Sequence, residues 1–117
     1  MCVIEDDGVV AYAYLLVDRK IVSDLWLYNQ ATTPRELPWQ HGGKPPCLNP
    51  AEFVDIKRMS APLDSTDFIT VTWRGENEVI GVEIELRGIR YGSMSVAAKP
   101  GMTIAAKRDG PLALVMQ

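Results

Sequence analysis

Apolar and polar residues alternate along residues 69–86, and this period of two is the strongest structural signal in the chain. Successive side chains of a β-strand point to opposite faces of the sheet, so a strand with one buried and one wet face has this pattern. The alternation breaks around Gly75-Glu76-Asn77, a run typical of a turn. The segment therefore predicts a β-hairpin. Its expected buried face consists of Ile69, Val71, Trp73, Ile80, Val82, Ile84 and Leu86.

A second hairpin is predicted between Val9 and Tyr28. The stretches Val9–Val17 and Ile21–Tyr28 are rich in Val, Leu, Ile and Tyr, which favour strands, and residues 18–20 supply a turn between them. Both faces of the first stretch are apolar, which indicates a central strand rather than an edge. The acidic run Glu5-Asp6-Asp7 with Gly8 is expected to form a tight turn that enters this strand, preceded by a frayed terminus.

Further short strands are predicted near the end of the chain. They cover roughly residues 90–98, 102–106 and 112–116, and the turn signals Pro100-Gly101 and Asp109-Gly110-Pro111 separate them. A chain of 117 residues is long enough for one core. The predicted fold is therefore a single all-β domain over residues 1–117, mostly antiparallel, with about seven strands in a sandwich or partly open barrel.

Residues 31–50 differ in kind, because they hold five prolines and two glycines and show no strand or helix period. They predict a long loop with at most a short helical turn at its end. In that turn Asn49 is expected to be the cap and Pro50 the first helical residue. Loops of this length are often functional. The loop carries Trp39, His41 and Cys47.

The side chains that catalysis and metal binding need are scarce. His41 is the only histidine, and Cys2 and Cys47 are the only cysteines. Structural zinc takes about four such ligands, so no metal and no cofactor is expected. A hydrolase that pairs Cys47 with His41 stays open, but their spacing matches no catalytic signature. We predict that the chain is not an enzyme.

Charge and hydropathy narrow the class of partner. The formal net charge is −3, and residues 1–67 hold ten acidic and six basic side chains. Nucleic-acid binding depends on a concentrated basic face, so we expect no nucleic-acid partner. Acidic residues interrupt the first apolar stretch, and no apolar run reaches the length of a membrane span. A cytoplasmic protein without membrane contact is predicted.

Three segments together resemble a known kind of protein. They are Asp24-Leu25-Trp26-Leu27-Tyr28-Asn29; Pro38-Trp39 leading to Leu48-Asn49-Pro50-Ala51-Glu52-Phe53; and Lys99-Pro100-Gly101 leading to Asp109-Gly110-Pro111-Leu112-Ala113. They resemble segments of small uncharacterised bacterial proteins, similar in size and layout to the immunity proteins that neutralise polymorphic or contact-dependent toxins. This resemblance implies an inhibitor that acts by occlusion, and it brings no catalytic residue with it.

The predicted function is thus non-enzymatic protein binding, of the immunity type, with a basic toxin domain as the partner. Acidic charge would speed capture of such a partner and aromatic anchors would slow its release. The candidate contacts are Asp18, Asp24, Glu36, Trp39 and His41. The alternative is a small-ligand or regulatory binding module, in which small alanines leave room for a pocket in the sheet. A homodimer through an edge strand, such as residues 112–116, also stays open.

Overall fold

The computed structural model describes residues 1–30, 49–64, 67–76, 79–96 and 98–116 of the chain. Within these residues there are eight strands and one short 3₁₀ helix. In chain order they are β1 (Cys2–Asp6), β2 (Val10–Val17), β3 (Lys20–Asn29), η2 (Ala51–Phe53), β4 (Ile69–Glu76), β5 (Val79–Leu86), β6 (Ile89–Ser95), β7 (Ala98–Thr103) and β8 (Leu114–Val115).

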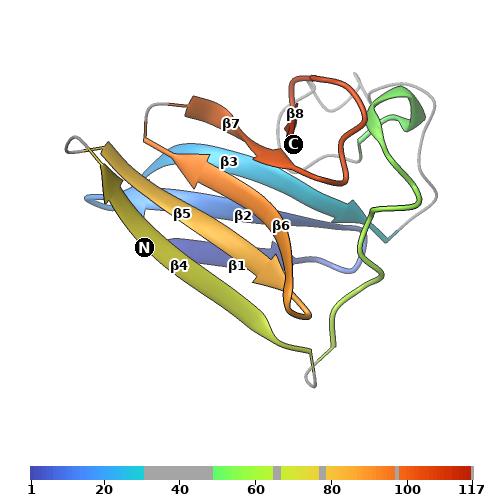
Figure 1. Cartoon of the computed structure of the whole chain (residues 1–117), viewed down its shortest axis with the longest axis horizontal. Coiled ribbons are helices and arrows are strands. Elements are labelled where there is room, and N and C mark those ends of the chain that lie inside the picture. Colours follow the sequence, from blue (N-terminus) through green and yellow to red (C-terminus); the bar gives the residue numbers. More distant parts are fainter. Residues whose placement is uncertain (31–48, 65–66, 77–78, 97, 117) are drawn as a thin grey trace.

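The strands form two sheets that lie one behind the other (Figure 1). One sheet has the order β1-β2-β3, and the other has the order β4-β5-β6-β7-β8. All neighbouring strands are antiparallel except β7 and β8, which are parallel. The predicted all-β, mostly antiparallel fold is confirmed. The described strands make a two-sheet arrangement and no closed barrel.

Both predicted hairpins are present. Strands β2 and β3 meet at a two-residue turn in which Asp18 and Arg19 have φ values of 52° and 67°. Positive φ at both turn residues suits the right-handed twist of a tight hairpin. Strand β2 lies between β1 and β3, as its two apolar faces predict. In the other hairpin Thr70 pairs with Glu85 and Thr72 with Glu83.

The prediction for the first residues is wrong. Glu5 and Asp6 belong to strand β1, which pairs with β2. The turn follows at residues 7–10, where the Asp7 amide donates to the Val10 carbonyl at 3.3 Å. The terminus is also held, because the Met1 amino group donates to the Leu16 carbonyl at 2.9 Å. Acidic residues have low strand propensity, but pairing with a central strand outweighs that weak preference. β1 is the eighth strand, which the prediction of about seven strands did not include.

Two smaller predictions also need correction. Pro100-Gly101 lies inside β7 rather than in a turn, at an irregularity where the pairing of β6 with β7 shifts register. Such an irregularity tolerates a proline, which has no N–H to donate. In the helical turn, Pro50 rather than Asn49 is the cap. Asn49 instead exchanges two 3.0 Å hydrogen bonds with the Asn29 side chain.

The two sheets approach most closely where β3 runs beside β7 and β6. The Ser23 hydroxyl of β3 donates to the Ala98 carbonyl at 2.7 Å, and the Trp26 amide donates to the Leu112 carbonyl at 3.1 Å. Glycine permits this approach: a Cβ on Gly92 would lie 2.7 Å from Leu25 Cδ2. We call this region, made by β3, β6 and β7, the closed side.

Candidate functional site

The predicted contact residues do not form one site in the described structure. Asp18 is exposed in the turn between β2 and β3, whereas Asp24 lies inside β3, about 13 Å along the extended strand from its start at Lys20. Glu36, Trp39 and His41 lie outside the described residues, as does Cys47. The role predicted for the long loop therefore stays a prediction.

Asp24 is buried rather than offered to a partner. It is 6% exposed, and its Oδ2 lies 3.7 Å from Lys99 Nζ. Burial raises the pKa of the Asp24 carboxyl, and the Lys99 ammonium partly offsets this increase. Asp24 pairs across the sheet with Tyr14, whose ring stacks on Tyr12 at a centroid distance of 6.0 Å. This burial leaves little of the carboxylate for a partner to contact.

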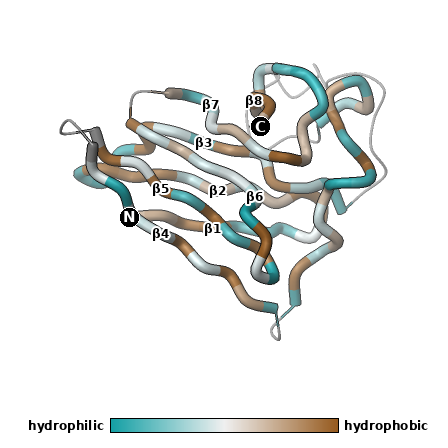
Figure 2. The backbone as a smooth tube through the Cα atoms, viewed as in Figure 1, coloured by the Kyte–Doolittle hydropathy of each residue, from teal (hydrophilic) through white to brown (hydrophobic). Residues whose placement is uncertain are grey.

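A large apolar surface lies instead around β4. Ile69 and Trp73 are 43% and 49% exposed, Ile80 is 40% exposed, and Phe68, just before the strand, is 79% exposed. We call these four residues the β4 apolar surface. The predicted buried face is confirmed for Val82, Ile84 and Leu86 of β5. Val71 is partly buried against the core, and the prediction is wrong for Ile69, Trp73 and Ile80. Figure 2 shows hydrophobic (brown) stretches along β4, at the outer end of its sheet.

The position of β4 explains this exposure. It is the end strand of a five-stranded sheet, and the opposing sheet has three strands. The opposing sheet approaches β6 and β7 through β3, so β4 lies beyond its closest contact. Ile80 is exposed for a second reason, because its cross-strand neighbour is Gly75, which has no side chain to cover it. We call the region made by β4 and the adjoining end of β5 the open side.

The free edge of β4 also presents backbone groups. The Phe68 carbonyl accepts from the Arg87 amide at 2.9 Å, so the backbone of Phe68 points toward the β5 side. Backbone direction alternates along an antiparallel strand. The N–H and C=O groups of Ile69, Val71 and Trp73 therefore point away from β5. Among the described strands none pairs with β4 on that side.

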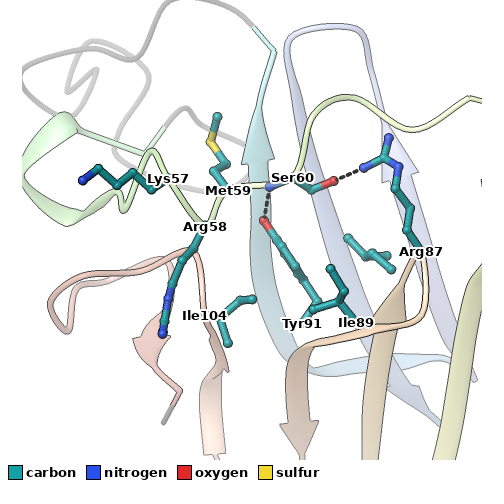
Figure 3. Close-up of a pocket in the computed structure, with 9 residues that line it drawn as sticks. Lys57, Arg58, Met59, Ser60, Arg87, Ile89, Tyr91 and Ile104 are labelled. Atoms are coloured by element: carbon teal, nitrogen blue, oxygen red, sulfur yellow. Dashed lines mark hydrogen bonds between the residues drawn. The ribbon is translucent and has the colours of Figure 1, made fainter.

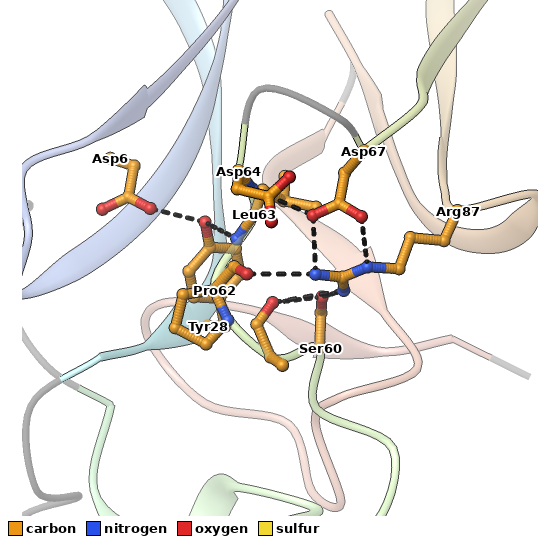
Figure 4. Close-up of polar contacts among 9 residues, drawn as sticks. Asp6, Tyr28, Ser60, Pro62, Leu63, Asp64, Asp67 and Arg87 are labelled. Atoms are coloured by element: carbon orange, nitrogen blue, oxygen red, sulfur yellow. Dashed lines mark hydrogen bonds and ion pairs between the residues drawn. The ribbon is translucent and has the colours of Figure 1, made fainter.

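Arg87 holds the chain that leads into β4 (Figure 4). Its Nε and Nη2 donate to the two Asp67 oxygens at 2.9 Å each. Its remaining donors reach the Ser60 hydroxyl and the carbonyls of Ala61 and Pro62 at 2.6–3.2 Å. The guanidinium lowers the pKa of the Asp67 carboxyl. A planar fork fits a carboxylate in this bidentate way, so Arg87 ties segment 60–67 to the end of β5.

Tyr28 holds the same segment from the closed side. Its hydroxyl donates to Asp6 Oδ2 at 2.6 Å and accepts from the Leu63 amide at 3.1 Å (Figure 4). Burial and the hydrogen bond to Asp6 raise the pKa of the Tyr28 hydroxyl to about 12. Arg87 thus holds residues 60–62 and Asp67, Tyr28 holds Leu63, and the exposure of Phe68 and Ile69 begins directly after Asp67.

A small cavity lies where segment 57–60 covers the start of β6 (Figure 3). Its volume is about 230 Å³. Leu86, Ile89, Tyr91 and Ile104 supply apolar surface, and Lys57 and Arg58 line it as well. Neither of these two cations has an ion pair within the described residues. The cavity could hold a small molecule with an apolar body and a negative charge.

The described residues do not gather the groups that a metal site needs: no three His, Cys, Asp or Glu side chains among them could hold an ion together. Nor does the described part of the chain include a helix with the length and apolar character to cross a membrane. No family model, no curated protein and no solved structure matches this chain. The resemblance to toxin-immunity proteins therefore stays a prediction.

Proposed function

We infer that this chain is a protein-binding domain that engages its partner through the β4 apolar surface. The observation that carries this proposal is the exposure of Phe68, Ile69 and Trp73 at a sheet edge that no other described strand pairs with. Ile69, Trp73 and Ile80 lie on one face of the hairpin and Phe68 on the opposite face, so both faces at this edge expose apolar side chains. Exposed apolar surface of this kind marks interaction sites in folded proteins. Exposed apolar residues cost free energy in water, and a partner that covers them recovers that cost.

The type of side chain supports protein binding. Large aromatic residues offer wide and rigid contact surface with few rotatable bonds, and they are enriched at interface hot spots. Trp73 and Phe68 are the aromatic anchors on this surface. The outward-pointing backbone of β4 adds main-chain hydrogen bonds, as in partners that extend a sheet by one strand.

The charge near β4 favours an apolar partner over a basic one. Segment 68–73 has no charged residue. Arg74, which follows it, is paired with Glu83 at 2.8 Å. The proposed partner therefore presents an apolar strand or face, which differs from the basic surface expected of a toxin captured by acidic residues.

A capture experiment with matched variants tests this proposal. We expect the immobilised wild-type chain to retain a protein from its native host in stoichiometric amounts, and the Trp73→Ser chain to lose it. Ile21→Ser is the control, because Ile21 is an exposed apolar residue of β3 outside the β4 apolar surface. Retention by the Trp73→Ser chain equal to that of wild type would contradict the proposal, as would a wild-type chain that retains nothing.

A second candidate function is the binding of a small anion, and the cavity beside segment 57–60 favours it. Its apolar wall and the Arg58 side chain at its border suit a short-chain carboxylate, whereas the Lys57 side chain points away from Tyr91 and Ile89 (Figure 3). Native mass spectrometry of the purified chain would show the added mass of such a ligand. Ile104→Phe should fill the cavity and remove that mass, and identical masses for both chains would exclude this candidate.

A further inference from the structure

We propose that the partner of the β4 apolar surface is a second copy of this chain, which pairs β4 with β4 antiparallel about a two-fold axis through Val71. This inference rests on the proposed function and names the partner. It follows from the other sheet edges of the molecule, from the backbone of β4, and from the side chains that this register brings together.

The other edges among the described strands are each protected. Strand β1 carries Glu5 and Asp6, and charges on an edge discourage pairing with another chain. Strand β3 has Leu112 against it, through the hydrogen bond from the Trp26 amide. Strand β8 has only two residues. The charged residues of β4 lie at its end, and the six residues before Arg74, 68–73, have neither charge nor proline, so among the described strands this edge has the longest stretch without a device against pairing.

The backbone of β4 suits an axis at Val71. Ile69, Val71 and Trp73 point their N–H and C=O groups outward, as the bond between Phe68 and Arg87 requires. About a two-fold axis at Val71, this residue faces itself and Ile69 faces Trp73 of the second copy. Every outward-pointing residue from 69 to 73 then meets another outward-pointing residue. The new ladder is fully hydrogen-bonded over residues 69–73.

The side chains also match in this register. Ile69 lies against Trp73 of the second copy, and an aliphatic residue opposite an aromatic ring is a favourable cross-strand pair. On the other face Thr70 meets Thr72. Arg74 meets Phe68, where a guanidinium over a ring is attractive, rather than its own like-charged copy. The strand is therefore complementary to itself, which a two-fold interface demands.

Charge placed at the axis tests the register. Val71→Lys puts two like charges directly opposite each other, and Val71→Glu does the same with the other sign. In sedimentation velocity we expect a wild-type dimer, monomers for each variant alone, and dimers again for their equimolar mixture. A wild type that stays monomeric overturns the proposal. So does a mixture that stays monomeric while circular dichroism shows both variants folded.

Cross-linking provides a test that leaves the charge of the strand unchanged. The Cα atoms of facing residues in a hydrogen-bonded antiparallel pair are about 5.5 Å apart, within the range of a disulfide. In a Cys2→Ser, Cys47→Ser background, Val71→Cys should give a covalent dimer on mild oxidation. Thr72→Cys is the control, because position 72 of one copy faces position 70 of the other and lies only diagonally from position 72. We expect at least about tenfold less covalent dimer from this variant. Equal yields for the two chains, or no product from either, contradict the Val71 axis.

The two proposals fail in different ways. If the wild-type chain is monomeric and Trp73→Ser abolishes capture of a different protein, the second copy is the wrong partner and protein binding at β4 stands. If the chain dimerises and the dimer survives both Trp73→Ser and Val71→Lys, the interface is elsewhere and both proposals fail. If the immobilised chain captures the untagged chain, and both Trp73→Ser and Val71→Lys abolish this capture, both proposals are supported.

Discussion

The closed side and the open side of this molecule have the same kind of strand sequence, but their apolar side chains are buried on the closed side and exposed on the open side. On the closed side Leu25 of β3 lies against Gly92 of β6 and is fully buried. On the open side Ile69 and Trp73 occupy equivalent positions of an alternating strand and are nearly half exposed. The difference is whether a second layer covers the face. An alternating pattern therefore specifies which face is apolar, and the neighbouring sheet decides whether that face becomes core or interface.

Truncation of one aliphatic residue on each side should show the largest contrast. Leu25→Ala removes a buried side chain and leaves a cavity, so we expect a loss of about 3–5 kcal/mol in the free energy of unfolding. Ile69→Ala should cost about 1 kcal/mol or less, because Ile69 is already partly in water. Urea denaturation at a concentration where the chain is monomeric measures both. Equal losses would mean that β4 is as well covered as β3.

A pair of glycines gives the next contrast. A Cβ on Gly101 would lie 2.7 Å from Met94 Cγ and 3.4 Å from Leu25 Cβ, whereas a Cβ on Gly75 would have nothing within 4 Å. Gly101→Ala should therefore destabilise the chain by about 2–3 kcal/mol. Gly75→Ala should change the free energy of unfolding by no more than about 0.5 kcal/mol. Thermal unfolding of the two variants tests this, and a tolerated Gly101→Ala would show that β6 and β7 are not closely packed.

Alkaline pH should weaken the hydrogen bonds by which the Tyr28 hydroxyl joins Leu63 and Asp6. The folded-state pKa of Tyr28, about 12, exceeds the ordinary value of about 10 in an unfolded chain. Its stabilising effect is therefore complete below about pH 10 and is lost as the pH rises toward 12. The magnitude is on the order of 1 kcal/mol, because the Asp6 carboxylate that accepts the hydrogen bond is exposed to solvent.

The Tyr28→Phe chain provides the comparison for this pH effect. Its stability should fall less steeply between pH 9 and 11.5 than that of wild type. Some dependence should remain, because burial also raises the pKa of Tyr91. Parallel stability curves for the two chains would show that the Tyr28 hydroxyl does not titrate with folding.

Loss of the Arg87 fork should have the smallest effect, confined to the approach to the open side. Arg87→Lys keeps the charge but cannot bind both Asp67 oxygens and the carbonyls of segment 60–62 together. We expect faster hydrogen exchange in residues 60–67, with β3 unchanged. Arg74→Lys is the control, because Arg74 pairs with Glu83 on the exposed face and touches no part of that segment in the described contacts. The same exchange increase in both variants would contradict a special role for Arg87.

Local sequence signals predicted the scaffold because they act over a few residues. The turn between β2 and β3 and the hairpin of β4 with β5 follow from turn chemistry and from a period of two. Strand β1 was missed because Glu5 and Asp6 have low strand propensity, and only the position of β2 beside them reveals the pairing. Pro100 was read as a turn because its tolerance depends on a register shift between β6 and β7.

The sequence predicted only part of the candidate site. The alternation correctly put Ile69, Trp73 and Ile80 on one apolar face, but it could not show that a three-stranded sheet leaves that face uncovered. One signal for the exposed edge was present, since segment 68–73 lacks charge. Asp24 looked accessible because its burial and its pairing with Lys99 depend on contacts 75 residues apart in the chain.

Hydrogen exchange along β4 tests the central claim most directly. The amides of Thr70 and Thr72 point to β5, whereas those of Ile69, Val71 and Trp73 point to the free edge. We predict that the outward amides are protected at high protein concentration and exchange freely on dilution, while the inward ones stay protected throughout. Outward amides that exchange equally fast at every concentration would contradict a β4 interface between two copies.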